Sequence, residues 1–169
     1  MPKTGKGVYI KSNPSCSKPN ASSTISDILF EDVRIIEPRW WAIWIGPQQQ
    51  HQPFAKLGED CALNFPLSPD CPTQGCVDFR RITLRRIVIE SPVLSPGVIL
   101  GNETNPMDVT FDGVVVTKWA AGNTGPGPFP YGKQFHCTST DLKLAPNSTN
   151  SPVPDCLSAP DDGGVQPAS

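Results

Sequence analysis

The segments ISDILFEDVRI (25–35), FRRITLRRIVI (79–89) and VTFDGVVV (109–116) determine the fold. Their apolar residues alternate as in a β-strand, but one extra residue interrupts the alternation where the chain must bend. The aligned residues Ile28, Ile82 and Val109 are 54 and 27 positions apart, which is two periods and one period of 27. Such a period is typical of a solenoid, whose coils bury their apolar faces only against neighbouring coils.

A second, shorter type of apolar segment lies between these repeats. We align its members so that Val8, Ile43 and Val98 form one inward-facing column. The surplus residues of the first two coils then fall at the same corner, where insertions do not disturb the stacking. The aligned segments are GVYIK (7–11), AIWIG (42–46) and GVILG (97–101). The sequence therefore predicts an all-β chain, a parallel β-helix of about three to four coils; the alternative is an antiparallel β-sandwich.

The composition excludes two kinds of partner. Charged residues make up 18% of the chain and its net charge is -2, so no basic excess exists to bind nucleic acid. No apolar stretch is long enough to cross a membrane. Residues 1–157 are expected to form the β-helix domain and its cap, with a long loop insertion at 47–75. The small, polar residues 158–169 are expected to be a disordered tail.

The cysteines indicate disulfides rather than a metal site. Their irregular spacing includes no Cys-x-x-Cys pair, so we expect no metal. The even count and three glycosylation sequons, at Asn20, Asn102 and Asn147, favour a secreted protein. From their placement, we expect Cys137 and Cys156 to fasten the C-terminal segment as a cap; the other pairings stay open. The six candidates are Cys16, Cys61, Cys71, Cys76, Cys137 and Cys156.

Several motifs resemble those of a known family. A Gly-Val-x-Ile-Lys strand ending at Lys11, the run Ile-x-Phe-Glu-Asp-Val at 28–33, Ile-Thr-Leu-Arg-Arg-Ile at 82–87 and a terminal cysteine pair are similar to the C-terminal part of glycoside hydrolase family 28. The resemblance to these polygalacturonases implies a right-handed, single-stranded β-helix of the pectin-lyase type. It implies a secreted parent that hydrolyses galacturonan or pectin with carboxylates and no cofactor. It also implies a polysaccharide partner that contains uronic acid.

The chain lacks the motifs that carry the family's catalysis. It contains no Asn-Thr-Asp and no Gly-His-Gly, and its one Asp-Asp pair lies in the polar tail. Inverting hydrolysis needs two carboxyl groups about 6.5–9.5 Å apart, and the strands of the second type have no outward acid. We therefore expect no catalytic residue here. Because the first strand starts by Gly7 without a capping element or a signal sequence, we expect the N-terminal coils of the parent to be missing.

One edge of a sugar-binding groove is the remaining expectation. By resemblance, Lys11 corresponds to a family lysine and would meet a uronate carboxylate. Tyr9 and Trp44 face outward by alternation and would stack on sugar rings one coil apart, whereas Trp41 would face inward. Alternatively, Lys11 is an ordinary exposed lysine and the tryptophans pack under the 47–75 loop. The function is then either that of a fragment of a polygalacturonase-like enzyme, or that of a non-catalytic polysaccharide-binding or structural β-helix.

Overall fold

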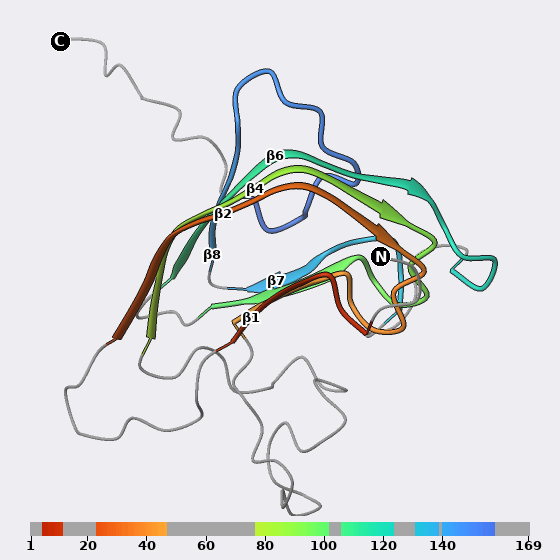
Figure 1. Cartoon of the computed structure of the whole chain (residues 1–169), viewed down its shortest axis with the longest axis horizontal. Helices are drawn as coiled ribbons and strands as arrows, with labels where there is room; N and C mark the ends of the chain where they lie inside the picture. Colours follow the sequence, from red (N-terminus) through yellow and green to blue (C-terminus); the bar gives the residue numbers. More distant parts are fainter. Residues whose placement is uncertain are drawn as a thin grey trace, which may run out of the picture.

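A computed structural model describes residues 5–11, 23–46, 77–101, 106–123, 131–138 and 140–157. All regular elements in these ranges are β-strands, and they alternate along the chain between two four-stranded sheets (Figure 1). The strands are β1 (Val8–Lys11), β2 (Ser23–Ile36), β3 (Ile43–Gly46), β4 (Val77–Glu90), β5 (Gly97–Leu100), β6 (Met107–Lys118), β7 (His136–Thr138) and β8 (Thr140–Leu144). The first sheet has the order β1-β3-β5-β7 and the second β2-β4-β6-β8.

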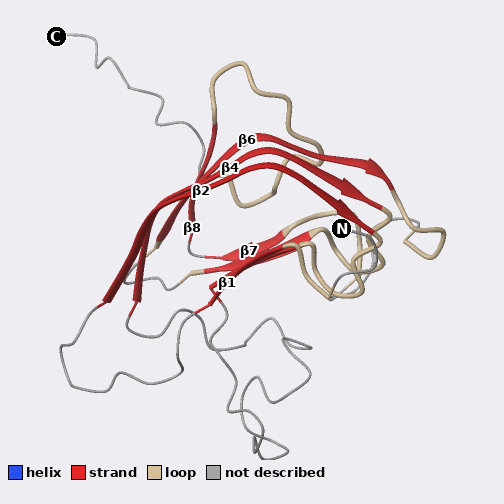
Figure 2. Cartoon of the chain, in the orientation of Figure 1, coloured by secondary structure: helices blue, strands red, loops and turns tan. Residues whose placement is uncertain are grey.

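Every pair of neighbouring strands is parallel, which confirms a parallel β-solenoid of about four coils and excludes the antiparallel sandwich. Figure 2 shows the two layers, with the long, bent strands of one sheet facing the short strands of the other. No helix long and apolar enough to span a membrane occurs in the described ranges.

The predicted column Ile28–Ile82–Val109 is confirmed by the strand register. Pairs from Ser23↔Val77 to Ile45↔Ile99 share one offset of 54 residues through both sheets. Two successive coils therefore align without a gap, and their inward side chains stack directly on one another. The two insertions follow β1 and β3, strands of the first sheet, as expected, and residues 12–22 and 47–76 lie outside the described ranges.

The column predicted for the first sheet is wrong at its third member. Val8 pairs with Ile43, but Ile43 pairs with Gly97 rather than Val98. A Cβ added at Gly97 would lie 2.9 Å from Ile43 Cβ and 3.0 Å from Phe135 Cδ1, so the inward position has room only for glycine. The Phe135 ring fills the space instead, and Val98 faces outward.

The predicted bend is present, but each of β2 and β4 has two residues in the left-handed region rather than the one extra residue expected. Asp27 and Asp32 have φ values of 59° and 56°, in the left-handed region, and their counterparts Arg81 and Arg86 have 50° and 51°. In β6 the second bend is at Gly113, with φ 84°, a conformation that glycine adopts without steric cost. These residues resume the inward alternation after each bend, and Figure 1 shows the resulting curve of β2, β4 and β6.

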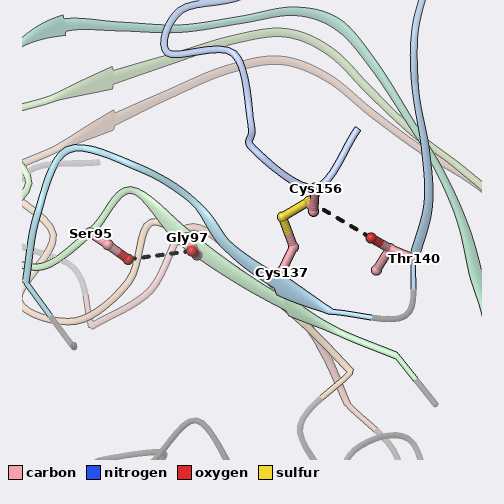
Figure 3. Close-up of a disulfide and its surroundings, with 5 residues drawn as sticks. All are labelled: Ser95, Gly97, Cys137, Thr140 and Cys156. Atoms are coloured by element: carbon pink, nitrogen blue, oxygen red, sulfur yellow. Dashed lines mark hydrogen bonds between the residues drawn. A yellow bond between two sulfur atoms is a disulfide. The ribbon is translucent and has the colours of Figure 1, made fainter. Parts of the chain in front are cut away.

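The C-terminal end of the solenoid carries a cap, as predicted. Cys137 and Cys156 form a disulfide with a Cα–Cα distance of 5.8 Å, and the Thr140 hydroxyl lies 3.8 Å from the Cys156 sulfur (Figure 3). The Asn150 side-chain oxygen accepts hydrogen bonds from the backbone N–H groups at 113 and 114. The predictions for Cys16, Cys61, Cys71, Cys76 and the tail 158–169 fall outside the described residues.

Candidate functional site

The outer face of β1 presents the two predicted binding residues of that strand. Tyr9 and Lys11 are two positions apart and therefore share a face, while Val8 and Ile10 are buried in the core. Tyr9 is 40% exposed and Lys11 is half-buried. In the register, Tyr9 lies opposite Trp44 and Lys11 opposite Gly46. The predicted neighbourhood of Tyr9 and Trp44 is thus present.

Two ammonium groups lie beside the Tyr9 ring. Lys11 Nζ is 5.0 Å from the ring centroid, and Lys6 Nζ is 4.2 Å from it and 4.9 Å from the centroid of the Trp44 ring. Such cation–π contacts hold the charges close to one point on the surface. The alternation of side chains in β1 did not predict the position of Lys6. Lys6 precedes the strand, so the direction of its side chain does not follow from the strand pleat.

The two charges influence each other. Burial and the charge of Lys11 lower the pKa of Lys6, and burial lowers the pKa of Lys11. Burial also raises the pKa of Tyr9, so its hydroxyl keeps its proton and remains a hydrogen-bond donor at neutral pH. A ligand carboxylate placed here would offset both the desolvation and the mutual repulsion of the ammonium groups.

Trp44 does not present an open stacking surface. It is 2% exposed. The centroid of its ring lies 5.7 Å from that of Tyr9 and 5.4 Å from that of Trp41, in edge-to-face contacts. Trp44 belongs to a second apolar cluster, outside the main core, with Trp41, Leu94, Val98 and Leu100. Side chains of the following coil therefore cover Trp44, and a sugar ring could not lie flat on it in this structure.

Trp41 is buried, as expected, but it does not join the inward column. It packs in the same outer cluster as Trp44 and donates its indole N–H to the Ser95 hydroxyl at 3.1 Å. Ser95 in turn donates to the Gly97 carbonyl (Figure 3). Because Trp41 precedes β3, the alternation of that strand does not extend to it. Trp41 packs against Trp44, and Trp44 packs against the Tyr9 ring, so these contacts hold Tyr9 in place on the outer face of β1.

The described residues contain no carboxylate pair suited to general acid–base catalysis at this face. Strands β1, β3, β5 and β7 have no Asp or Glu. The acids of the other sheet are paired with basic side chains, with arginines in β2 and with Lys143 at Asp108 and Asp141, and the Arg81 guanidinium lowers the pKa of Asp27 to about 2. A general acid needs a raised pKa instead. Among the described residues, no cluster of His, Cys, Asp and Glu could hold a metal.

Two further features, one predicted and one not, lie outside this face. Asn147, the sequon residue after β8, is exposed; Asn20 and Asn102 are not among the described residues. A shallow groove of about 670 Å³ crosses the ends of β2, β4 and β6, and its lining includes Arg39, Lys118 and Trp119. Sequence reasoning missed this groove, because its residues come from three turns after the repeats.

Comparison of the chain with models of protein families, with characterised proteins and with solved structures finds no match. The chain is defined at the level of its class, a parallel β-solenoid with a capped C-terminal end.

Proposed function

We propose that this chain binds an acidic, uronic-acid-containing polysaccharide through Lys6, Tyr9 and Lys11 on the outer face of β1. The supporting observation is the position of two ammonium groups within 5.0 Å of the centroid of one partly exposed tyrosine ring. A flat strand surface with paired cations matches a polymer whose carboxylates lie along an extended chain. Each ammonium is a flexible point charge and fits a single carboxylate oxygen.

In this binding mode the charge dominates and the aromatic ring is a scaffold. The carboxylate would lie between the ammonium groups of Lys6 and Lys11, where it offsets the burial and the repulsion from Lys11 that lower the pKa of Lys6. The Tyr9 hydroxyl would donate to a sugar oxygen. Trp44, which is buried, holds the Tyr9 ring in place rather than stacking on sugar.

The parent activity that we propose is the hydrolysis of a galacturonan-type polysaccharide, in a secreted protein that resembles glycoside hydrolase family 28. The quoted sequence motifs, the parallel coils, the disulfide and the exposed sequon at Asn147 support it. In this proposal, coils preceding β1 supply the catalytic carboxylates, and this chain supplies the end of the groove and the cap.

A non-catalytic polysaccharide-binding module is the second candidate. It is favoured by the lack of acids on the strands of the first sheet and by the arginine-paired acids of the second. Both candidates bind polysaccharide, but only the first predicts reducing ends when the parent is assayed on polygalacturonate.

Binding is tested by calorimetric titration of the whole chain with oligogalacturonate, with uncharged galactan oligomers as the ligand control. We expect binding of oligogalacturonate alone, weakened about five- to tenfold by Lys11→Ala, since a hydrogen bond to a charged group contributes about 1–1.4 kcal/mol at a partly exposed site. Lys118→Ala, in the groove at the strand ends, is the matched control and should bind normally. Equal binding by the two lysine variants, or no binding of the charged oligomer, would refute the proposal.

A further inference from the structure

The two ends of the solenoid differ in how well their coils are covered. In β4 the inward residues Phe79, Ile82, Leu84 and Ile87 are all 0% exposed. Their counterparts in β2 share the same inward direction but are only half-buried. These residues are Ile25, Ile28, Phe30 and Val33. Within the described residues, β2 has a neighbour only on its β4 side, so its other edge is open.

The opposite end is closed by the chain itself. Ser151 donates its N–H to the Val114 carbonyl and accepts from Val116, and Leu157 bridges Leu142 in the last strand. Leu142 is accordingly 1% exposed. In Figure 1 this segment follows β8 as the blue trace. The open edge of β2 therefore differs from the capped end in backbone pairing and in apolar burial.

The charges of successive coils alternate in sign. Each arginine of β4 at the bends contacts carboxylates of β2, and two of them also contact β6. Arg85 is held between Glu31 at 3.3 Å and Asp112 at 2.7 Å, and Arg81 bonds Asp27 through its side chain and Asp108 through its backbone N–H. At the positions of Arg81 and Arg85, the side chains are thus acidic in β2, basic in β4 and acidic in β6. The acids of the open coil are Asp27, Glu31 and Asp32, and their arginine partners are Arg81, Arg85 and Arg86.

We propose that the open edge of β2 binds a parallel β-strand with apolar inward residues and with Arg or Lys opposite Asp27, Glu31 and Asp32. At this level β1 already extends the first sheet beyond β3, so only a strand beside β2 is needed to complete the coil. Such a strand would bury the half-exposed residues and continue the alternation of charge. Its source would be the preceding part of the parent protein, so this assignment of source rests on the proposed function. The chemistry of the occupant rests only on the described contacts.

A second copy of the chain fits this edge poorly. Two β2 edges that meet would run antiparallel and bring acids against acids, which is unfavourable. A head-to-tail contact would require β8, whose end the cap covers. The same physics that specifies the internal register thus discriminates against self-association.

The test uses the whole chain, labelled with ¹⁵N, and a synthetic peptide that copies Val77–Glu90, the basic strand of this protein. The matched control peptide has Glu in place of its four arginines at 80, 81, 85 and 86. We expect amide shifts in β2 but not in β8, and about tenfold weaker binding of the control, because three exposed ion pairs together contribute about 1.4 kcal/mol. In Asp27→Asn/Asp32→Asn, checked for folding by circular dichroism, the two peptides should bind more equally.

Several results would overturn the inference: no binding of the arginine peptide, equal binding of both peptides to the unaltered chain, or shifts centred on β8. A dimer in sedimentation would assign the edge to a second copy and would also overturn it. The titration contains no sugar, so failure here and failure of polysaccharide binding are separate outcomes. Peptide binding without oligogalacturonate binding would refute only the proposed function.

Discussion

Shortening the stacked isoleucines Ile28 and Ile82, one in the open coil and one in the central coil, gives a quantitative test of the stacking. Ile82 is 0% exposed between Ile28 and Val109, whereas Ile28 occupies the equivalent, half-buried position in the open coil. Replacing isoleucine by alanine removes about three methylene equivalents, or about 2.4 kcal/mol of transfer free energy. A residual cavity adds to this in a fully enclosed site. We therefore expect Ile82→Ala to lower the free energy of unfolding by about 3–4 kcal/mol, and Ile28→Ala by about 1–2 kcal/mol.

The assay is urea unfolding followed by tryptophan fluorescence. The unfolding midpoints of the two variants are compared, and an unchanged dependence of the free energy on urea shows that the difference is one of stability. A chain of this size loses about 2–4 °C of Tm per kcal/mol, so Ile82→Ala should melt about 10 °C lower. Thermal scans give an independent reading of the same difference. Equal losses in the two variants, or a larger loss for Ile28→Ala, would refute the placement of Ile82 in an enclosed central coil and of Ile28 at its open end.

Three further predictions concern the cap, the inner glycine and the charged bends. Replacing both Cys137 and Cys156 by serine should lower the free energy of unfolding by about 3 kcal/mol, since the bridge closes a loop of 19 residues; chemical denaturation measures the loss, and an unchanged midpoint would contradict it. Gly97→Ala should cost about 1–3 kcal/mol by overpacking against Ile43 and Phe135, while Gly122→Ala, with no atom within 4 Å, is the matched control; similar melting of the two would count against the register. The pKa of Asp27 lies at about 2 beside Arg81, below its ordinary value of 3.8, so this pair's stabilisation is complete above pH 3.8 and is lost as the pH falls towards 2. The free energy of unfolding of Asp27→Asn should therefore fall less steeply than that of the unaltered chain as the pH is lowered below 3.8. An identical pH dependence of the two chains would argue against the pair.

The repeat was predictable because each apolar position is fixed by local alternation and by its neighbours one coil away. Ile28, Ile82 and Val109 carry this information in the sequence itself. The position of Val98 was mispredicted because Val98 was aligned with Val8 and Ile43, whereas the constant offset of 54 residues pairs Ile43 with Gly97. A glycine can occupy an inward position when a distant ring fills the space, and Phe135 does so here.

The candidate site was predictable only in part, for a similar reason. Alternation placed Tyr9 and Lys11 on the outer face of β1, and it placed Trp44 beside Tyr9. It could not reveal that residues of the next coil, Leu94 and Leu100, bury Trp44. Outer-face burial depends on tertiary packing rather than on the pleat, and the direction of Lys6 depends on the path of the chain before the strand.

Amide shift mapping with oligogalacturonate tests polysaccharide binding and its location together. In a titration of the ¹⁵N-labelled chain at neutral pH, the largest shifts are predicted at Lys6, Tyr9 and Lys11, with smaller shifts at Trp44 behind the Tyr9 ring. Shifts centred instead on Arg39, Lys118 and Trp119 at the strand ends, or no shifts at millimolar ligand, would contradict binding at the outer face of β1.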